Sequence, residues 1–265
     1  MRFLLFFAFI GCFMNTYAIH ENKISAGKAA AMGNTRVTTQ SIWSVYYNQA
    51  GLAYLKNIEI GGLHQTGYVK EQNLQGIVFA LPTKTGTLGA SYSYYGYSQY
   101  SETQAGLAFA RSFTKYFSVG LQLNYLHTHI AGNYKDIRSV NFEIGLLSEP
   151  IDHFFIGAHI YNPSHSKTGK EQIPTIIDFG LSYLFSGKIL LAVGVEKDFN
   201  YKPVFKLGID YKVISFISLQ AGISTNPDRY SFGIGFNYKN INANIACFKH
   251  QTLGFTPSFT LSYAF

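Results

Sequence analysis

Histidines are the residues of this chain best suited to acid–base or metal chemistry, and two of the eight lie close together. His127 and His129 are two residues apart, so in a strand both side chains lie on one face and could bind a metal ion. A catalytic histidine would need a nucleophilic serine and a third polar group. No third ligand or catalytic partner is identifiable at a matching spacing, and histidines at strand ends are usually solvated. We therefore expect no catalytic residue, no metal site and no cofactor.

Charged residues form a second set with chemical potential, because alternation along the chain places five of them on one face of their segments. These residues are Glu143, Asp178, Glu196, Lys206 and Asp210. Counting from the segment ends puts Asp178, Glu196 and Lys206 at similar depth in neighbouring strands. If these segments enclose a narrow interior, two interpretations remain open. The charges form either an ion-paired layer that satisfies that interior or a polar constriction for a solute. Arg36 or Lys28 could supply additional positive charge.

The segments that carry these charges alternate between apolar and small or polar residues. From Phe255 to Phe265 every second residue is apolar, and the residues between them are Thr, Ser, Thr, Ser and Ala. Successive side chains of a strand point to opposite faces, so each such segment has one apolar and one small polar face. About fourteen segments show this pattern: residues 57–66, 73–81, 87–97, 103–111, 117–130, 139–147, 153–161, 174–185, 189–198, 203–212, 216–224, 230–239, 241–249 and 255–265.

Composition indicates where such strands would fold. Aromatic residues make up 17% of the chain and charged residues only 13%, whereas soluble domains carry about 25% charged residues. The aromatic content excludes a disordered chain. A soluble sandwich would place Lys, Glu and Asp on its outer face, but here the second face is mostly Gly, Ser, Ala, Thr and Asn. The net charge of +7 is scattered, with no basic run, so it does not support nucleic-acid binding.

These features predict an all-β fold, a transmembrane antiparallel β-barrel of about 14 strands formed by residues 57–265. Most segments have the roughly 9–11 residues that a tilted strand needs to cross a bilayer. Every second connection is short, such as residues 186–188 and 213–215, whereas others reach the length of residues 162–173. Outer-membrane barrels have short periplasmic turns and longer external loops. We expect the bacterial outer membrane as the location and its lipid as the surroundings.

Residues 1–18 have the features of a secretory signal peptide. Arg2 precedes an apolar stretch, and Thr16-Tyr17-Ala18 provides small residues at the positions that signal peptidase reads. We expect cleavage near Ala18. The alternative is a lipoprotein signal with lipidation of Cys12, although the bulky residues before Cys12 fit that motif poorly. After cleavage near Ala18, Cys247 is the one cysteine left, which excludes an intramolecular disulfide.

Residues 19–56 do not alternate, and we expect them to form a plug. The segment carries the aromatic residues Trp43, Tyr46 and Tyr47, followed by Asn48, and the nearest site that could bury them is the barrel lumen. The alternative is an aromatic belt at the membrane interface.

The inward faces of nine segments contain glycine at similar depth, and we call this set the glycine belt. It consists of Gly106, Gly120, Gly145, Gly157, Gly180, Gly194, Gly208, Gly222 and Gly235. Glycine inside a strand marks either a bend or the close approach of another group, and small closed sheets do need bends. We expect the plug to pack its aromatic residues against this belt and to close the pore.

Two motifs carry a resemblance to known families. Ala31-Met32-Gly33-Asn34 and Asn48-Gln49-Ala50-Gly51-Leu52-Ala53 precede the strands, and Phe265 ends the last one. This arrangement resembles the PorV/PorQ proteins of type IX secretion and the FadL-type transporters of hydrophobic compounds. Both have an "AMGG"-like stretch, an Asn-Pro-Ala-Gly-Leu-Ala-like motif and a fourteen-stranded outer-membrane barrel. Gln49 stands here where proline is usual.

The resemblance implies a non-enzymatic outer-membrane protein. The first function it implies is a PorV/PorQ-like role in protein secretion or envelope organisation, with other envelope or secretion proteins as partners. The alternative is a FadL-like channel for small hydrophobic compounds, and a third is a structural barrel without transport. FadL-type transporters are longer and have a large external ligand site, and the loops of this chain leave little room for one.

Overall fold

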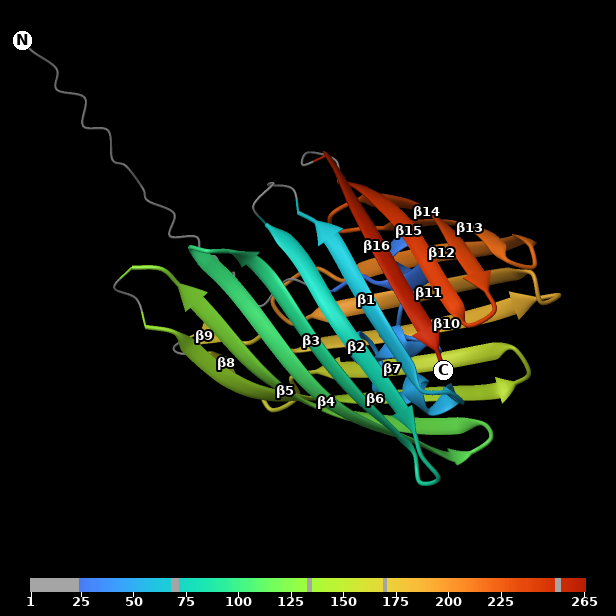
Figure 1. Ribbon diagram of the computed structural model, residues 1–265, viewed down its shortest axis with the longest axis horizontal. Coiled ribbons are helices and arrows are strands. Elements are labelled where there is room, and N and C mark those ends of the chain that lie inside the picture. The colour runs from blue at the N-terminus through green and yellow to red at the C-terminus, as the bar shows by residue number, and fades with distance from the viewer. Residues whose placement is uncertain (1–23, 68–71, 133–134, 169–170, 251–253) are drawn as a thin grey trace, which may run out of the picture.

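The computed structural model describes residues 24–67, 72–132, 135–168, 171–250 and 254–265. The expected signal peptide, with Ala18 and Cys12, lies outside these described residues, as do the first residues of the expected plug. Figure 1 shows a single closed sheet with short helical segments inside it.

Fourteen antiparallel strands form the closed barrel, and the predicted fold class is confirmed. Each strand pairs with its neighbours along the chain, and β1 pairs with β16 to close the sheet. The strands are β1 (Glu59–Thr66), β2 (Asn73–Pro82), β3 (Thr87–Tyr97), β4 (Tyr100–Thr114), β5 (Phe117–Ile130), β6 (Ile137–Ile151), β7 (Phe154–Tyr161), β10 (Ile176–Phe185), β11 (Ile189–Asp198), β12 (Val204–Ile214), β13 (Ile217–Ser224), β14 (Arg229–Tyr238), β15 (Ile241–His250) and β16 (Gly254–Ala264).

Two features of the strands differ from the sequence prediction. A small hairpin, β8 (Lys167–Thr168) and β9 (Glu171–Gln172), lies in the connection between β7 and β10, which the sequence indicated only as a loop. Strands β4 and β6 are longer than the alternating segments 103–111 and 139–147. Pairing with β3 and β5 continues past the point where apolar alternation ends, because backbone hydrogen bonds do not require an apolar side chain.

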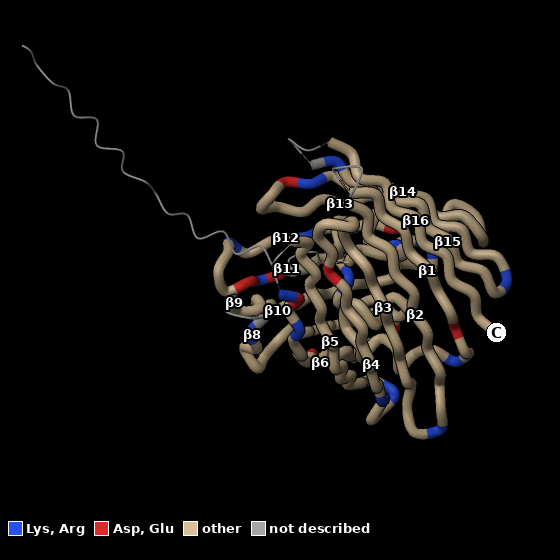
Figure 2. The backbone as a smooth tube through the Cα atoms, turned by 60° about the vertical axis from the view of Figure 1, so that its left-hand side comes forward, with Lys and Arg blue, Asp and Glu red and all other residues tan. Residues whose placement is uncertain are grey.

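The two faces of the barrel wall differ sharply in exposure. On the outer face, Leu107 is 71% exposed and Phe255 is 66% exposed, whereas their inward neighbours Ala108 and Thr256 are 4% and 1% exposed. Charged residues gather mainly at turns and loops, and the walls are mostly uncharged (Figure 2). An outer surface of large apolar side chains is suited to the hydrocarbon interior of a bilayer.

The lumen contains the residues that precede the first strand. They form α1 (Gly27–Ala31) and the 3₁₀ segments η1 (Ile42–Tyr46) and η2 (Gln49–Tyr54), seen inside the barrel in Figure 1. The turn into η1 is fixed by Ser44, whose hydroxyl accepts a hydrogen bond from the Ser41 amide at 3.3 Å and donates to the Thr39 carbonyl at 2.8 Å. None of the helices in the described part of the chain is long and apolar enough to cross a membrane.

The facing of β5 leads to a stability prediction. Leu121 is 52% exposed on the outer face and lies about 13 Å along the strand from its start. Leu121→Arg should therefore lower the free energy of unfolding from lipid vesicles by about 2–4 kcal/mol. Ile151→Arg, at the end of β6, should cost only about 0–1 kcal/mol because the charge can reach water. Urea titrations in vesicles measure both values, and equal costs would contradict the placement of Leu121 deep in the membrane and Ile151 at its edge.

Candidate functional site

The segment 24–56, which we call the plug, follows the glycine belt with its backbone. A Cβ atom added to any of six belt glycines would overlap plug atoms; these glycines are Gly222, Gly208, Gly180, Gly157, Gly145 and Gly120. Their partners in the plug advance from Met32 and Gly33 through Val37 to Asn48 and Gln49 as the wall passes from β13 to β5. The missing side chains thus form a track along which two backbones can lie in contact.

Gly33 explains part of the first motif. Its φ of 63° belongs to the left-handed region that favours glycine, and a Cβ there would also lie 2.7 Å from the Leu207 carbonyl oxygen. The Gly33 amide donates to the hydroxyl of Ser231 at 2.7 Å, and that hydroxyl lies 2.9 Å from the Ala31 carbonyl. The turn after α1 is therefore fastened to β14 by one side chain.

Three belt glycines do not have the neighbours that we expected. The nearest atoms to a Cβ at Gly106 and Gly235 belong to side chains of adjacent strands, and a Cβ at Gly194 would meet only ordinary contacts at 3.4 Å and 3.9 Å. Near Gly194 a small space remains between plug and wall, lined by residues 34–38 of the plug together with Asp178 and Lys206. The prediction that all nine glycines receive the plug is wrong for these three.

Four other glycines contact the plug, and the predicted belt does not include them. Gly61, Gly76, Gly89 and Gly233 would each place a Cβ against Trp43, Tyr46, Leu52 or Ala31. All four face inward by the same two-residue alternation, which could have identified them.

The aromatic residues of the plug pack away from most of the belt. Trp43 lies over Gly61 and joins an apolar cluster with Leu63 and Val78 of β1 and β2. An indole ring needs apolar neighbours, which the first two strands provide and the glycine track does not. The expectation that the aromatic residues pack on the belt is therefore wrong, and so is the alternative of an interfacial belt, because Trp43 is only 3% exposed inside the lumen.

The two tyrosines are fixed by their hydroxyl groups. Tyr46 donates towards the carbonyls of Tyr92 at 3.0 Å and Ile77 at 3.3 Å, in the wall. Tyr47 donates to the Ala26 carbonyl at 2.8 Å and also accepts a hydrogen bond from the Ala26 amide, which ties α1 to η1.

Four charged groups form a neutral network between plug and wall. Arg36 of the plug lies 3.2 Å from both Asp178 and Glu196, and Lys206 lies 3.1 Å from Asp178 and 2.6 Å from Glu196. The side chains are at most 8% exposed. Two cations and two carboxylates satisfy one another here, as buried charges must. Arg36 is the additional cation that the sequence analysis left open.

The other two predicted lumen charges lie outside this network, so the five do not form a single layer. Asp210 is four residues from Lys206 on β12, about 13 Å along the strand, and its carboxylate is 3.9 Å from the ammonium group of Lys28. Glu143 accepts hydrogen bonds from Gln49 at 2.8 Å and Asn124 at 2.6 Å.

Gln49 and His159 are lumen residues that the sequence analysis did not assign. The His159 ring nitrogen lies 2.8 Å from Glu143. Gln49, fully buried, occupies the motif position where proline is usual, and its amide binds a carboxylate that proline could not. Next to it, the Asn48 amide donates to the carbonyls of Val37 at 2.7 Å and Leu146 at 2.8 Å. This second attachment joins η2 to β6.

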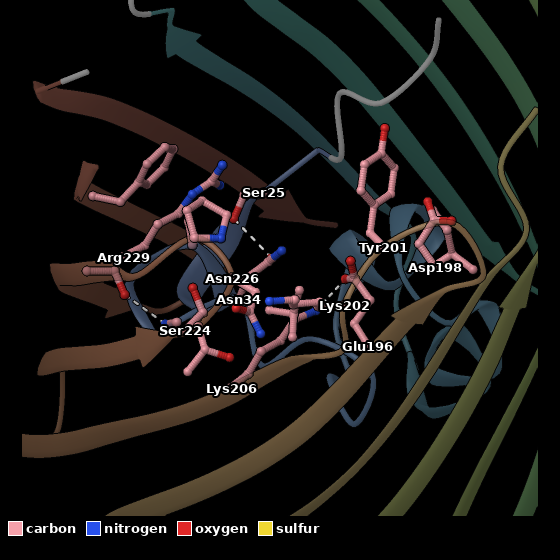
Figure 3. A pocket seen from close by; sticks show the side chains of 18 of the residues that line it. Ser25, Asn34, Glu196, Asp198, Tyr201, Lys202, Lys206, Ser224, Asn226 and Arg229 are labelled. Atoms are coloured by element: carbon pink, nitrogen blue, oxygen red, sulfur yellow. Dashed lines mark hydrogen bonds and ion pairs between the residues drawn. The ribbon is translucent and has the colours of Figure 1, made fainter. Parts of the chain in front are cut away.

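A cavity of about 540 Å³ lies at the end of the lumen with the longer loops. The plug and the charge network form the floor of this cavity, where Asn34, Glu196 and Lys206 lie (Figure 3). Ile176, Val204 and Phe248 are among its apolar lining residues, and the exposed residues Lys202 and Arg229 also line it. The Ser25 hydroxyl donates to Asn34 at 3.1 Å across the floor.

The two histidines considered as metal ligands lie outside the lumen. His129 and His127 place ring nitrogens 2.7 Å and 3.2 Å from Asp136, next to the loop between β5 and β6. These hydrogen bonds hold the pKa of Asp136 below its usual value. Among the described residues no three His, Cys, Asp or Glu side chains are grouped to hold a metal ion.

No known family model and no curated protein matches the sequence. The structure, in contrast, is similar to several solved ones. The toluene transporter TbuX of Ralstonia pickettii has a TM-score of 0.71 and 12% identity, covering 92% of this chain and 99% of TbuX. The Pseudomonas putida toluene transporter TodX has a TM-score of 0.67 and 12% identity, covering 89% and 96%. A Pseudomonas aeruginosa FadL homologue has a TM-score of 0.63 and 11% identity, covering 91% and 98%.

This is the FadL-type barrel fold. The similar structures include transporters named for hydrocarbons, and PorV/PorQ proteins are not among those described above. The resemblance to PorV/PorQ proteins therefore stays a prediction.

The glycine track leads to a prediction about closure. In Gly208→Ala the new methyl group would overlap the backbone of Met32 and lie 2.6 Å from the Thr35 hydroxyl, so the plug must shift. We expect higher single-channel conductance in planar bilayers and faster proteolysis within residues 24–56. Gly194→Ala is the matched control, since only ordinary contacts surround that site. Unchanged conductance and proteolysis in Gly208→Ala would refute the role of the track.

The charge network leads to a second prediction. Arg36→Gln leaves two buried carboxylates with Lys206 alone, and breaking a buried ion pair costs about 3–5 kcal/mol. Lys28→Gln removes a plug cation that is 39% exposed and 3.9 Å from its partner, which should cost about 0–1 kcal/mol. Thermal unfolding in detergent micelles should separate the two variants, and similar melting temperatures would exclude the network as an attachment of the plug.

Proposed function

We propose that this chain is an outer-membrane channel that admits small hydrophobic compounds, of the monoaromatic kind for which TodX and TbuX are named. The cavity at the long-loop end of the lumen carries the proposal. Its volume of about 540 Å³ lies within the roughly 300–1,000 Å³ of small-molecule sites. The cavity is bounded below by a plug that non-covalent contacts hold, so the lumen can open without breaking the wall.

Part of the cavity wall is apolar and therefore favours an apolar ligand. Ile176, Val204 and Phe248 offer apolar surface next to the mouth of the barrel. A channel of this kind needs no catalytic group. The location in the outer membrane, after cleavage near Ala18, belongs to this proposal.

A PorV/PorQ-like role in secretion or envelope organisation rests on the sequence motifs alone. Both motifs have local structural explanations here: Gly33 makes the turn after α1, and Asn48 joins η2 to the wall. Because these contacts serve any plugged barrel, they do not favour a secretion partner over a channel.

Uptake of toluene tests the channel. Cells that make the protein should take up radiolabelled toluene faster than an otherwise identical deletion strain. Ser224→Trp should reduce this uptake, because Ser224 lines the cavity and the indole would fill it. Thr85→Trp, in the exposed short turn between β2 and β3, serves as the control. Equal amounts of each variant in the outer membrane, with heat-dependent gel mobility, verify insertion.

Two results would overturn the proposal. One is equal toluene uptake with and without the gene. The other is an undiminished rate in Ser224→Trp, which would exclude the cavity as the entrance.

A further inference from the structure

Three hydroxyl groups on the inner face of β16 have no hydrogen-bond partner among the described residues. The side-chain oxygens of Thr256, Ser258 and Thr260 are buried and unpartnered in the part of the chain that the structure describes. The residues are 1%, 3% and 1% exposed. Buried polar groups are nearly always hydrogen-bonded, so three in a row on one strand need an explanation.

The plug covers this face of the wall with apolar surface. Helix α1 contacts β14, β15 and β16, and its buried residues are glycine and alanine. Trp43 lies over Gly61 of β1, the strand that pairs with β16. The hydrogen bonds that hold α1 go to Ser231 of β14 and to Tyr47 of the plug, and none of the described ones reaches β16. In the described part of the chain, β16 is therefore in contact with the plug without a hydrogen bond to it.

The unpartnered hydroxyls continue a polar row from one end of the lumen to the other. At the cavity, Gln65 pairs with Ser258 in the sheet, lines the cavity and has an unpartnered side-chain oxygen. On β15, the other neighbour of β16, Asn244 pairs with Thr260.

From Thr260 towards the short turns, the row continues as side-chain amides, beginning with Asn244 beside Thr260. Asn244 donates to Asn242 at 2.8 Å, and Asn242 in turn donates to Asn237, which is exposed beside the short turn between β14 and β15. We call Gln65, Thr256, Ser258, Thr260 and Asn244 the hydroxyl–amide row.

The row carries no charge, unlike the opposite side of the lumen. Its five members are uncharged, whereas Arg36, Asp178, Glu196 and Lys206 lie along β10–β12. A solute beside the row would meet donors and acceptors on the wall and an apolar surface of alanine and tryptophan on the plug. That combination fits an uncharged molecule with an apolar body and a hydroxyl group.

We propose that the hydroxyl–amide row is the path by which solutes pass between the plug and the wall, and that it favours small alcohols and phenols over hydrocarbons of the same shape. The path is closed while α1 covers β16. It opens when α1 leaves that wall, and the solute hydroxyl then bonds to Thr256, Ser258 and Thr260 in succession. This inference rests on the proposed channel function and specifies which compounds the channel prefers.

Benzyl alcohol and toluene test the preference, because they share a ring and differ by one hydroxyl group. The triple variant Thr256→Val, Ser258→Ala, Thr260→Val removes the hydroxyls and keeps the wall nearly the same size. We measure uptake of radiolabelled benzyl alcohol by cells and subtract the uptake of the deletion strain. In the triple variant this difference should fall by about two- to tenfold, which corresponds to the net free energy of one hydrogen bond. Uptake of toluene should change little. Thr87→Val with Ser182→Ala, buried hydroxyls on β3 and β10, should leave both rates unchanged.

The outcomes separate the two proposals. Equal reductions for both solutes, or no change for either, would overturn the path while leaving the channel intact. If neither solute enters wild-type cells faster than the deletion strain, the channel function itself fails. Should the triple variant be poorly inserted, Ser258→Ala alone makes the same comparison, with a smaller expected reduction.

Discussion

Closure of the sheet is the constraint on which the rest of the structure depends. Once β1 pairs with β16, every strand has one face towards the lumen and one away from it, so a period of two in the sequence becomes an inside and an outside. The outer face can then be apolar all round, and the inner face must either be filled or hold water. Here the residues before β1 fill it, and the inner face is therefore shaped to receive a polypeptide backbone.

The contact between plug and wall is uneven around the barrel. Along β5–β13 the plug backbone lies against glycines, and Arg36, Asn48 and Gln49 bond to wall residues. Along β16 the hydroxyls of Thr256, Ser258 and Thr260 are covered and have no hydrogen-bond partner among the residues that the structure describes. Each unsatisfied buried group costs about 1–3 kcal/mol, so closure is weakest at that wall. A plug attached firmly on one side and loosely on the other can open by local movement of α1 while η2 stays in place.

Features that depend on neighbouring residues in the sequence could be predicted, whereas those that depend on contacts between distant segments could not. Strand number, facing and the inward direction of Asp178, Glu196 and Lys206 depend on local alternation, which the sequence shows directly. The choice of Arg36 over Lys28 as the cation of the network depends on how a segment without alternation crosses the lumen. The same holds for Trp43, which packs on β1 and β2, and for Gly194, which faces charged side chains. Inward-facing glycines can be read from the sequence, but which of them meets the plug cannot.

The distribution of charge decides what a channel of this shape would select. A buried charge network needs all four of its members, so the β10–β12 side of the lumen is fixed and offers little to a passing solute. The β16 side has uncharged hydroxyls that lack hydrogen-bond partners in the described parts of the chain. A pure hydrocarbon would leave those groups unsatisfied as the plug does now, whereas a hydroxyl-bearing solute would satisfy them in turn. The polar residues in the cavity, such as Gln65 and Ser231, are consistent with that selection, and Ile176, Val204 and Phe248 beside them suit the hydrocarbon part of the same solute.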